Sequence, residues 1–385
     1  MKRILYLFVI VPLLVCCGKN DKPENQEPDN NQPEQPQDEL PVQIKDGDVV
    51  LATNPNVEKF ITTVTYPEKD YSFTHILDEE FQPTAPGVDD VPSKYTIRWT
   101  PDPEAGEPVL KLVEDSGWSR EYSGDDIEEG YYVTISNLCP NAKYTYEVKA
   151  GDKVLTSGSF TTTGHIHQVI FSNVRNARDL GGWKTKDGKT VKFRKIYRGG
   201  RLQKSELRAR GRRDIAAEGF KAQLDLRGVD DVLSASPLEG VEFCAPVIEE
   251  GYIWLLRDDK DKAKQCMQFI MKCVSENKPV YYHCSLGRDR TGTISMLILG
   301  LLGVDEGEIS KEYEITQFAP NGWATSTGEK VKMTRKKDAD YWLAANYIWG
   351  MTPEGGTFAQ GVQTYLLSLG ITQAEIDEFR NNMLE

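Results

Sequence analysis

Short stretches of alternating apolar and polar residues dominate the chain between about residues 45 and 163. In residues 95–99, tyrosine, isoleucine and tryptophan alternate with threonine and arginine, so the three apolar side chains share one face of a strand. Residues 131–135 form a second run of aromatic and β-branched residues, and turn-forming residues bound both runs. With little helical periodicity in this region, the pattern predicts a domain built of short strands.

From residue 168 onward the pattern changes to apolar strands that alternate with amphipathic helices. Strands are predicted at 222–227, 241–247 and 279–282, and helices at about 205–218, 261–276 and 292–302. The last of these helices is so dense in apolar residues that we expect it to be buried. This alternation favours a mostly parallel sheet covered by helices, which is an α/β fold.

The N-terminus of the chain has the features of a bacterial lipoprotein signal. Basic residues precede an apolar run over 4–15, which is too short to span a bilayer as a mature helix. The run ends in Val15, Cys16 and Cys17 and resembles a lipobox, whose cysteine is lipidated and becomes the new N-terminus. We expect the lipid on Cys17, with Cys16 as the alternative and an ordinary secretory signal as a third interpretation. A lipoprotein would be anchored in the bacterial cell envelope, facing the periplasm or the exterior.

A polar segment follows the predicted signal. Residues 19–41 consist almost entirely of Asn, Gln, Glu, Asp, Lys and Pro. Such a composition cannot bury a hydrophobic core, so we predict a disordered tether that holds the globular part away from the membrane surface.

Three features of the β-rich region resemble a fibronectin type III domain. Trp99 lies on an early strand, Leu138 and Pro140 follow, and the 144–148 run places two tyrosines where that family has its tyrosine corner. The resemblance covers about residues 90–163 and implies a β-sandwich. A spacer or scaffold is the preferred role, and binding of carbohydrate or protein is the alternative.

Composition and charge narrow the function of the 385-residue chain. Its net charge of −13 argues against a nucleic-acid binder, which would normally present a basic surface. The seven cysteines suggest no disulfide framework, because the closely spaced pair Cys266 and Cys273 would lie about 10 Å apart along one helix. His165 and His167 have no cysteine or histidine partner at ligand spacing, so we predict no metal site there.

The most informative stretch is a loop between the predicted strand at 279–282 and the predicted helix that follows. It contains His283 and Cys284, then five residues, then Arg290 and Thr291. A helix N-terminus and nearby cations lower the pKa of a cysteine thiol, which makes the nucleophilic thiolate available. The planar guanidinium of Arg290 suits two oxygens of a phosphoryl group. We therefore predict an anion-binding loop with a nucleophile.

The other residues of the loop have supporting roles in this interpretation. Gly287 permits the backbone conformation that closes the loop, and Thr291 is a candidate donor to the sulfur when the thiolate leaves. Backbone N–H groups of the loop would bind the phosphoryl oxygens, and we expect substrate contacts from Ser285, Leu286, Gly287 and Arg288. The alternative is a buried, inert structural cysteine.

The loop resembles the signature of the cysteine-dependent phosphatases. An Asn-x-Arg-Asp-Leu-Gly-Gly run at 176–182, Tyr-Arg at 197–198 and Asp-Leu-Arg at 225–227 precede it. Together they resemble the bacterial tyrosine-phosphatase-like enzymes related to the secreted mycobacterial dual protein and lipid phosphatase, over about residues 165–385. That family usually has a lysine where this chain has Arg288, so substrate preference is expected to differ.

The resemblance implies phosphoryl transfer through a cysteinyl-phosphate, with no metal or other cofactor. Asp289 is one candidate general acid, and the alternatives lie upstream at Glu249, Glu250, Asp258, Asp259 and Asp261. Arg178, Asp179 and Arg198 are expected to orient the loop or to contact substrate, with a purely structural turn as the alternative for the first two.

The expected substrate is a phosphotyrosine protein, accepted with broad specificity. A phosphoinositide or inositol phosphate is the alternative, and an inactive surface lipoprotein that binds phospho-ligands is a third interpretation. The predicted organisation comprises a lipoprotein signal (1–17), a linker (18–44), a fibronectin type III-like β-sandwich (45–163) and an α/β phosphatase domain (164–385). A fragment from about residue 164 is expected to stay active unless the first domain packs on the cleft.

Overall fold

The computed structural model describes residues 40–66, 91–203, 207–319 and 339–385. The predicted lipoprotein signal and nearly all of the predicted linker lie outside these residues and stay predictions. Within the described ranges, no helix combines the length and the apolar character needed to cross a membrane.

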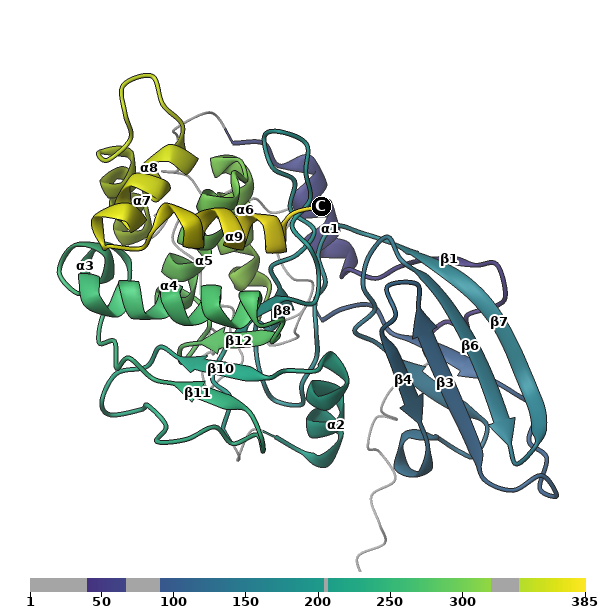
Figure 1. Cartoon of the computed structure of the whole chain (residues 1–385). Helices are drawn as coiled ribbons and strands as arrows, with labels where there is room; N and C mark the ends of the chain where they lie inside the picture. The colour runs from purple at the N-terminus through teal and green to yellow at the C-terminus, as the bar shows by residue number, and fades with distance from the viewer. Residues whose placement is uncertain (1–39, 67–90, 204–206, 320–338) are drawn as a thin grey trace, which may run out of the picture. The chain divides into compact units, whose positions relative to one another are not determined.

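A mostly parallel five-stranded sheet forms the centre of the C-terminal part, as the sequence predicted (Figure 1). Its strands are β8 (Arg178–Asp179), β9 (Ile196–Gly199), β10 (Ala222–Asp225), β11 (Glu242–Cys244) and β12 (Val280–His283). Their order is β11-β10-β12-β9-β8, and all neighbours are parallel except β8, which runs antiparallel to β9. This order brings the ends of β9, β10 and β12 together at one edge.

Helices and the sheet share two hydrophobic cores. The helices are α2 (Ala209–Glu218), α3 (Tyr252–Arg257), α4 (Lys260–Ser275), α5 (Asp289–Leu302), α6 (Glu306–Glu314), α7 (Ala339–Trp349), α8 (Phe358–Ser368) and α9 (Gln373–Met383), with a 3-10 turn at Ile315–Phe318. Val280 and Tyr282 join the core that contains α3 to α9, whereas Tyr281 between them joins the core that contains α2. The period-2 alternation of β12 therefore assigns one face of the sheet to each core.

Two further sheets form the N-terminal part. The first has the order β1-β7-β6-β3-β4 and the second pairs β2 with β5. The strands are β1 (Val49–Leu51), β2 (Tyr95–Arg98), β3 (Pro108–Glu114), β4 (Ser119–Tyr122), β5 (Tyr132–Ile135), β6 (Lys143–Ala150) and β7 (Lys153–Thr163), with a 3-10 turn at Gly124–Asp126. Ile97 of β2 and Val133 of β5 share a buried cluster with Leu110 and Tyr144 of the larger sheet. The Tyr144 hydroxyl accepts the backbone N–H of Cys139 at 2.8 Å. Membership of the fibronectin type III family stays a prediction.

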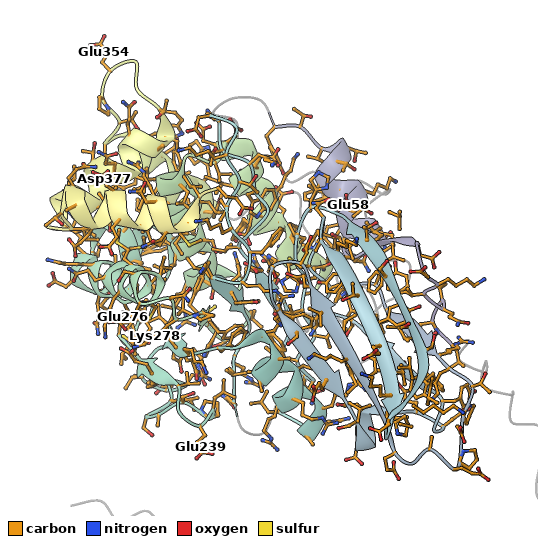
Figure 2. The ribbon with its side chains drawn as sticks, turned by 45° about the vertical axis from the view of Figure 1, so that its right-hand side comes forward. Glu58, Glu239, Glu276, Lys278, Glu354 and Asp377 are labelled. Carbon is orange, nitrogen blue, oxygen red and sulfur yellow. The ribbon has the colours of Figure 1, made fainter. Side chains whose placement is uncertain are left out.

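Helix α1 (Pro55–Thr63) is a feature that the sequence pattern missed. The Asn54 side chain caps it by accepting the backbone N–H of Asn56 at 2.8 Å, and Pro55 occupies the first turn, where its missing N–H costs nothing. Its buried side chains join the core of the C-terminal part and not that of the neighbouring β strands. Glu58 of α1, labelled in Figure 2, lies 2.6 Å from the His165 imidazole. His165 is thus paired with a carboxylate.

Arg194 joins the β-rich part to the C-terminal part through a cluster of charges. Its guanidinium donates to Glu114 of β3 and to Glu218 of α2, each at 2.6 Å. It also lies over the ring of Trp118, 4.3 Å from the centroid, and the indole N–H of Trp118 donates to the Ala217 carbonyl at 2.7 Å. The guanidinium of Arg194 therefore contacts the β-rich part through Glu114 and the C-terminal part through Glu218.

Candidate active site

Cys284 lies between β12 and α5, as the sequence predicted. β12 ends at His283, whose in-register neighbours are Gly199 on β9 and Asp225 on β10. The loop over 284–288 therefore lies at the carboxyl ends of three parallel strands, which is where ligands bind in open α/β sheets. The N-terminus of α5 adds backbone N–H groups and the positive end of the helix dipole.

Gly287 is the position at which this loop requires glycine. Its φ is +70°, a conformation that side chains disfavour. A Cβ at this position would also lie 2.3 Å from the carbonyl carbon of Gly199, a rigid backbone atom of β9. Any side chain would therefore push the loop away from the sheet.

Cys284, the candidate nucleophile, lies in the loop, and Arg290 and Thr291 lie in the first turn of α5. Cys284 is 1% exposed. One guanidinium nitrogen of Arg290 donates to the Ile248 carbonyl at 2.8 Å, and its other N–H groups have no hydrogen-bond partner in the described part of the chain. The buried Thr291 hydroxyl likewise lacks a hydrogen-bond partner among the described residues. Among the described residues, these donors are therefore available for the roles that the sequence predicted for Arg290 and Thr291.

His283 supports the backbone and does not supply positive charge. Burial lowers the pKa of His283 to about 4, and Asp225 opposes the shift only in part. The Gln223 amide nitrogen lies 2.9 Å from Nε2 of His283, while the Gln223 oxygen accepts the Ser236 hydroxyl at 2.6 Å. An amide nitrogen only donates, so Nε2 is the acceptor, and the proton on Nδ1 faces the Cys284 carbonyl at 3.3 Å. The neutral imidazole therefore adds no positive charge beside the Cys284 thiol.

The buried neutral His283 predicts a pH-dependent loss of stability. The unfolded chain takes up this proton near pH 6.5, but the native imidazole does so only near its pKa of about 4. The contribution of His283 to folding stability is therefore constant above pH 6.5 and falls by up to about 3 kcal/mol between pH 6.5 and 4. Denaturant unfolding of His283→Asn, which keeps an acceptor for Gln223, should lack this component.

The exposed His165 serves as a control of opposite sign for that measurement. The Glu58 carboxylate raises the pKa of His165, so its contribution is present below pH 6.5 and disappears as the pH rises through its folded pKa. His165→Asn should therefore leave the acid-side loss intact. Equal acid-side losses in wild type and His283→Asn would contradict the assignment.

Three residues expected to orient the loop or to contact substrate are buried. Arg178 and Arg198 both pair with Glu312 of α6. Of the two alternatives, this geometry favours orientation of the loop. The Asp179 carboxylate accepts the backbone N–H groups of Gly181 at 2.8 Å and Arg194 at 2.5 Å, so it stabilises a turn. Of the alternatives for Asp179, this geometry favours the structural turn.

Two candidate acids lie at the rim of the loop, each with a partner. Asp289, whose side chain is 40% exposed, accepts the Tyr252 hydroxyl at 2.5 Å. Glu249 accepts the backbone N–H of Val229 at 2.9 Å. Both carboxylates are positioned by hydrogen bonds, so the geometry leaves the choice between them open.

The remaining upstream candidates lie in surroundings less suited to an acid. Asp258 pairs with Arg257 at 2.7 Å and Asp259 with Lys262 at 3.3 Å. Glu250 and Asp261 are exposed like Glu249, but no hydrogen bond among the described residues positions their carboxylates as Val229 positions that of Glu249. Another carboxylate, that of Asp231, was not predicted from the sequence and lies 3.4 Å from the Ser285 hydroxyl. Its position shortly after the strand that carries Asp225 could have indicated it.

The other expected substrate contacts occupy the wall of the loop. Ser285, Leu286 and Arg288 are half-buried. The Nε atom of Arg288 lies 3.5 Å from the Asp289 carboxylate, so its charge is partly balanced inside the loop. In the described part of the chain, no cluster of three or more His, Cys, Asp or Glu side chains is arranged to hold a metal ion.

Comparison with known proteins identifies relatives for the C-terminal part. The model of the tyrosine phosphatase family matches residues 169–385, more than half of the chain. A protein of Cupriavidus necator, whose name assigns it provisionally to the tyrosine-protein phosphatases, is 24% identical over 171 residues, which are 38% of this chain and 62% of that protein. The tyrosine-protein phosphatase of Nostoc commune is 28% identical over 145 residues, which are 34% of this chain and 47% of that protein. The chain thus spans about half to three fifths of these relatives.

Two solved structures are also similar to part of the chain. A mutant form of Tk-PTP has 19% identity and a TM-score of 0.23, covering 36% of this chain and 87% of its own. The core catalytic domain of a PP-IP phosphatase from S. cerevisiae, in complex with citrate, has 17% identity and a TM-score of 0.25, covering 40% and 88%. At these TM-scores neither similarity bears on the function. The match over residues 169–385 is what assigns the chain, which belongs to the tyrosine phosphatase family.

Proposed function

We propose that this protein hydrolyses phosphate monoesters through a cysteinyl-phosphate intermediate. The observation that carries the proposal is the loop between β12 and α5. There a buried thiol, a helix N-terminus and a guanidinium, some of whose donors have no partner among the described residues, meet at the carboxyl edge of the sheet. Membership of the tyrosine phosphatase family supports it.

In the first step, the Cys284 thiolate attacks phosphorus and forms a sulfur–phosphorus bond while the ester oxygen–phosphorus bond breaks. Backbone N–H groups of the loop and the Arg290 guanidinium stabilise charge on the non-bridging oxygens. The departing oxygen takes a proton from a carboxylic acid, for which Asp289 and Glu249 are the candidates, and leaves as an alcohol or phenol.

In the second step, water attacks the cysteinyl-phosphate. The new oxygen–phosphorus bond forms as the sulfur–phosphorus bond breaks, and the carboxylate from the first step accepts the proton from water. Inorganic phosphate is released, and the electron pair returns to Cys284 as a thiolate. The Thr291 hydroxyl, which has no other hydrogen-bond partner among the described residues, would donate to the departing sulfur.

Phosphotyrosine in proteins is the substrate class that we propose first, with broad specificity. Both relatives carry the name of tyrosine-protein phosphatases. A phosphoinositide or inositol phosphate is the second candidate, because Arg288 offers a further guanidinium beside the reacting phosphate. The lipid expected on Cys17 would hold the enzyme at the bacterial cell envelope.

A direct assay tests this function. The full chain should hydrolyse an aryl phosphate in the presence of a chelator and should cleave a phosphotyrosine peptide at least about tenfold more efficiently, in kcat/KM, than a phosphoinositide in vesicles. The reverse order would favour the phosphoinositide class. Phosphate binding without turnover of any monoester would contradict the enzyme and support an inactive phospho-ligand-binding protein.

A further inference from the structure

Glu312 of α6 lies between two buried guanidinium groups. Its side chain is 2% exposed. One carboxylate oxygen accepts Nε of Arg178 at 2.8 Å and lies 2.7 Å from a second nitrogen of that group, and the other oxygen accepts Arg198 at 2.7 Å. One carboxylate therefore fixes the orientation of both arginines.

The two arginines transmit this orientation to the signature loop. Arg198 donates directly to the Gly287 carbonyl. Arg178 donates to the Asn176 side-chain oxygen, and the amide nitrogen of Asn176 donates to the carbonyls of Leu286 at 3.2 Å and Gly287 at 2.9 Å. Two successive carbonyls of the loop are therefore held by donors that converge on Glu312.

Holding a carbonyl also aims the N–H group that follows it. The peptide unit is planar and trans, so the C=O of one residue and the N–H of the next point in opposite directions. Fixing the Leu286 and Gly287 carbonyls toward Asn176 and Arg198 directs the N–H groups of Gly287 and Arg288 the other way. These are among the N–H groups that the proposed function assigns to the phosphoryl oxygens.

We propose that Glu312 is a positioning residue that sets the direction of the loop N–H groups through Arg178, Arg198 and Asn176. Its carboxylate acts through Arg178 and Arg198, and the inference rests on the proposed function only for the identity of the anion. Glu312 also balances charge, since burial and then Arg198 lower the pKa of Arg178 to about 10, and Glu312 acts in the opposite direction. Without its charge, two buried cations would repel each other and release the carbonyls.

Glu312→Gln in the full chain tests the proposal against a matched control. Glu306→Gln makes the same change in the same helix at a residue that is 7% exposed and pairs with Lys186, with no connection to the loop. The readouts are affinity for inorganic phosphate, the pH midpoint of Cys284 alkylation by iodoacetamide followed by mass spectrometry, and thermal unfolding.

We expect Glu312→Gln to weaken phosphate binding about tenfold or more and to raise the alkylation midpoint by about one pH unit, because misdirected N–H groups stabilise neither phosphate nor thiolate. Glu312→Asp should recover part of both effects, and Glu306→Gln should change neither. Alkylation requires no turnover, so it tests Glu312 even if no monoester is hydrolysed and the proposed function fails.

Unchanged phosphate affinity and alkylation midpoint in a folded Glu312→Gln protein would overturn the proposal and leave Glu312 a purely structural residue. If that variant does not fold, Asn176→Ala at a half-buried position removes the Asn176 bonds to the Leu286 and Gly287 carbonyls, while both ion pairs and the Arg198 bond to Gly287 stay in place. The same two shifts, smaller in size, would then support the proposal, and their absence would overturn it.

Discussion

Cys284→Ser is expected to lower turnover of an aryl phosphate by more than about a thousandfold while inorganic phosphate still binds. A serine hydroxyl is not ionised near neutral pH, and His283 is not placed to activate it, because its unprotonated Nε2 accepts from the Gln223 amide and its Nδ1 proton faces a carbonyl. The anion-binding groups, Arg290 and the N-terminus of α5, are unchanged by the substitution. Steady-state kinetics and calorimetric titration with phosphate measure the two properties separately.

The matched control for this experiment is Cys244→Ser. Cys244 lies on the edge strand β11, is half-buried and makes no contact with the loop, so the same chemical change should leave kcat/KM within about twofold. Residual turnover of Cys284→Ser above about a thousandth of wild type, beyond contamination, would exclude the covalent route. Loss of both turnover and phosphate binding would indicate that the loop had collapsed, and Cys284→Ala, which removes the thiol without adding a polar group to this buried position, would replace the variant.

The strand, loop and helix around Cys284 were predictable because these parts are contiguous in the sequence. The strand, the tight turn and the buried helix each follow from a local pattern. The spacing of Cys284 and Arg290 also indicated that both belong to one anion-binding loop. The helices predicted at 261–276 and 292–302 are observed as Lys260–Ser275 and Asp289–Leu302. Both carry hydrophobic faces long enough to outweigh other local preferences.

The support of the loop was not predictable, because it depends on packing between distant segments. Glu312 lies 134 positions from Arg178 in the chain. The local sequence around it, including Lys311 and Tyr313, gives no sign that Glu312 and not one of its neighbours contacts that arginine. Likewise, a motif such as Asn-x-Arg-Asp indicates polar residues near a site without indicating which of them are buried. The structure separates Arg178, which supports the loop, from Asp179, which stabilises a turn.

A different reason explains why helix α1 was not predicted from the sequence. Asn54 and Pro55 form a helix-start signal, and Val57, Phe60 and Ile61 have the i, i+3, i+4 spacing of a buried helical face. The strand-rich surroundings outweighed this short signal. Its consequence is large, because α1 lies outside residues 169–385 and yet packs into the core of the matched part.

Removal of residues 1–163 is therefore expected to destabilise the family domain rather than to release an active enzyme. The ring centroids of Phe60 in α1 and Phe318 lie 5.5 Å apart in an edge-to-face pair. Lys311 of α6 donates to the Ile61 carbonyl at 2.8 Å. Losing three fully or almost fully buried side chains at about 1.5–3 kcal/mol each removes an amount similar to the whole stability of many domains. The cut also leaves Arg194 with only Glu218 of its two carboxylates. This revises the expectation that a fragment from about residue 164 stays active.

Phe60→Ala in the full chain isolates the contribution of α1 from that of the β strands. Burial of this ring predicts a loss of about 3–5 kcal/mol in the free energy of unfolding. Lys59→Ala, at the exposed neighbouring position of the same helix, should cost less than about 1 kcal/mol. Urea unfolding measures the stability of both variants. The solubility and the aryl-phosphate activity of the fragment 164–385 are measured separately.

A soluble, fully active fragment together with a Phe60→Ala variant as stable as Lys59→Ala would show that residues 169–385 fold alone. The opposite result would make α1 part of the catalytic unit, acting on α6, the helix that carries Glu312.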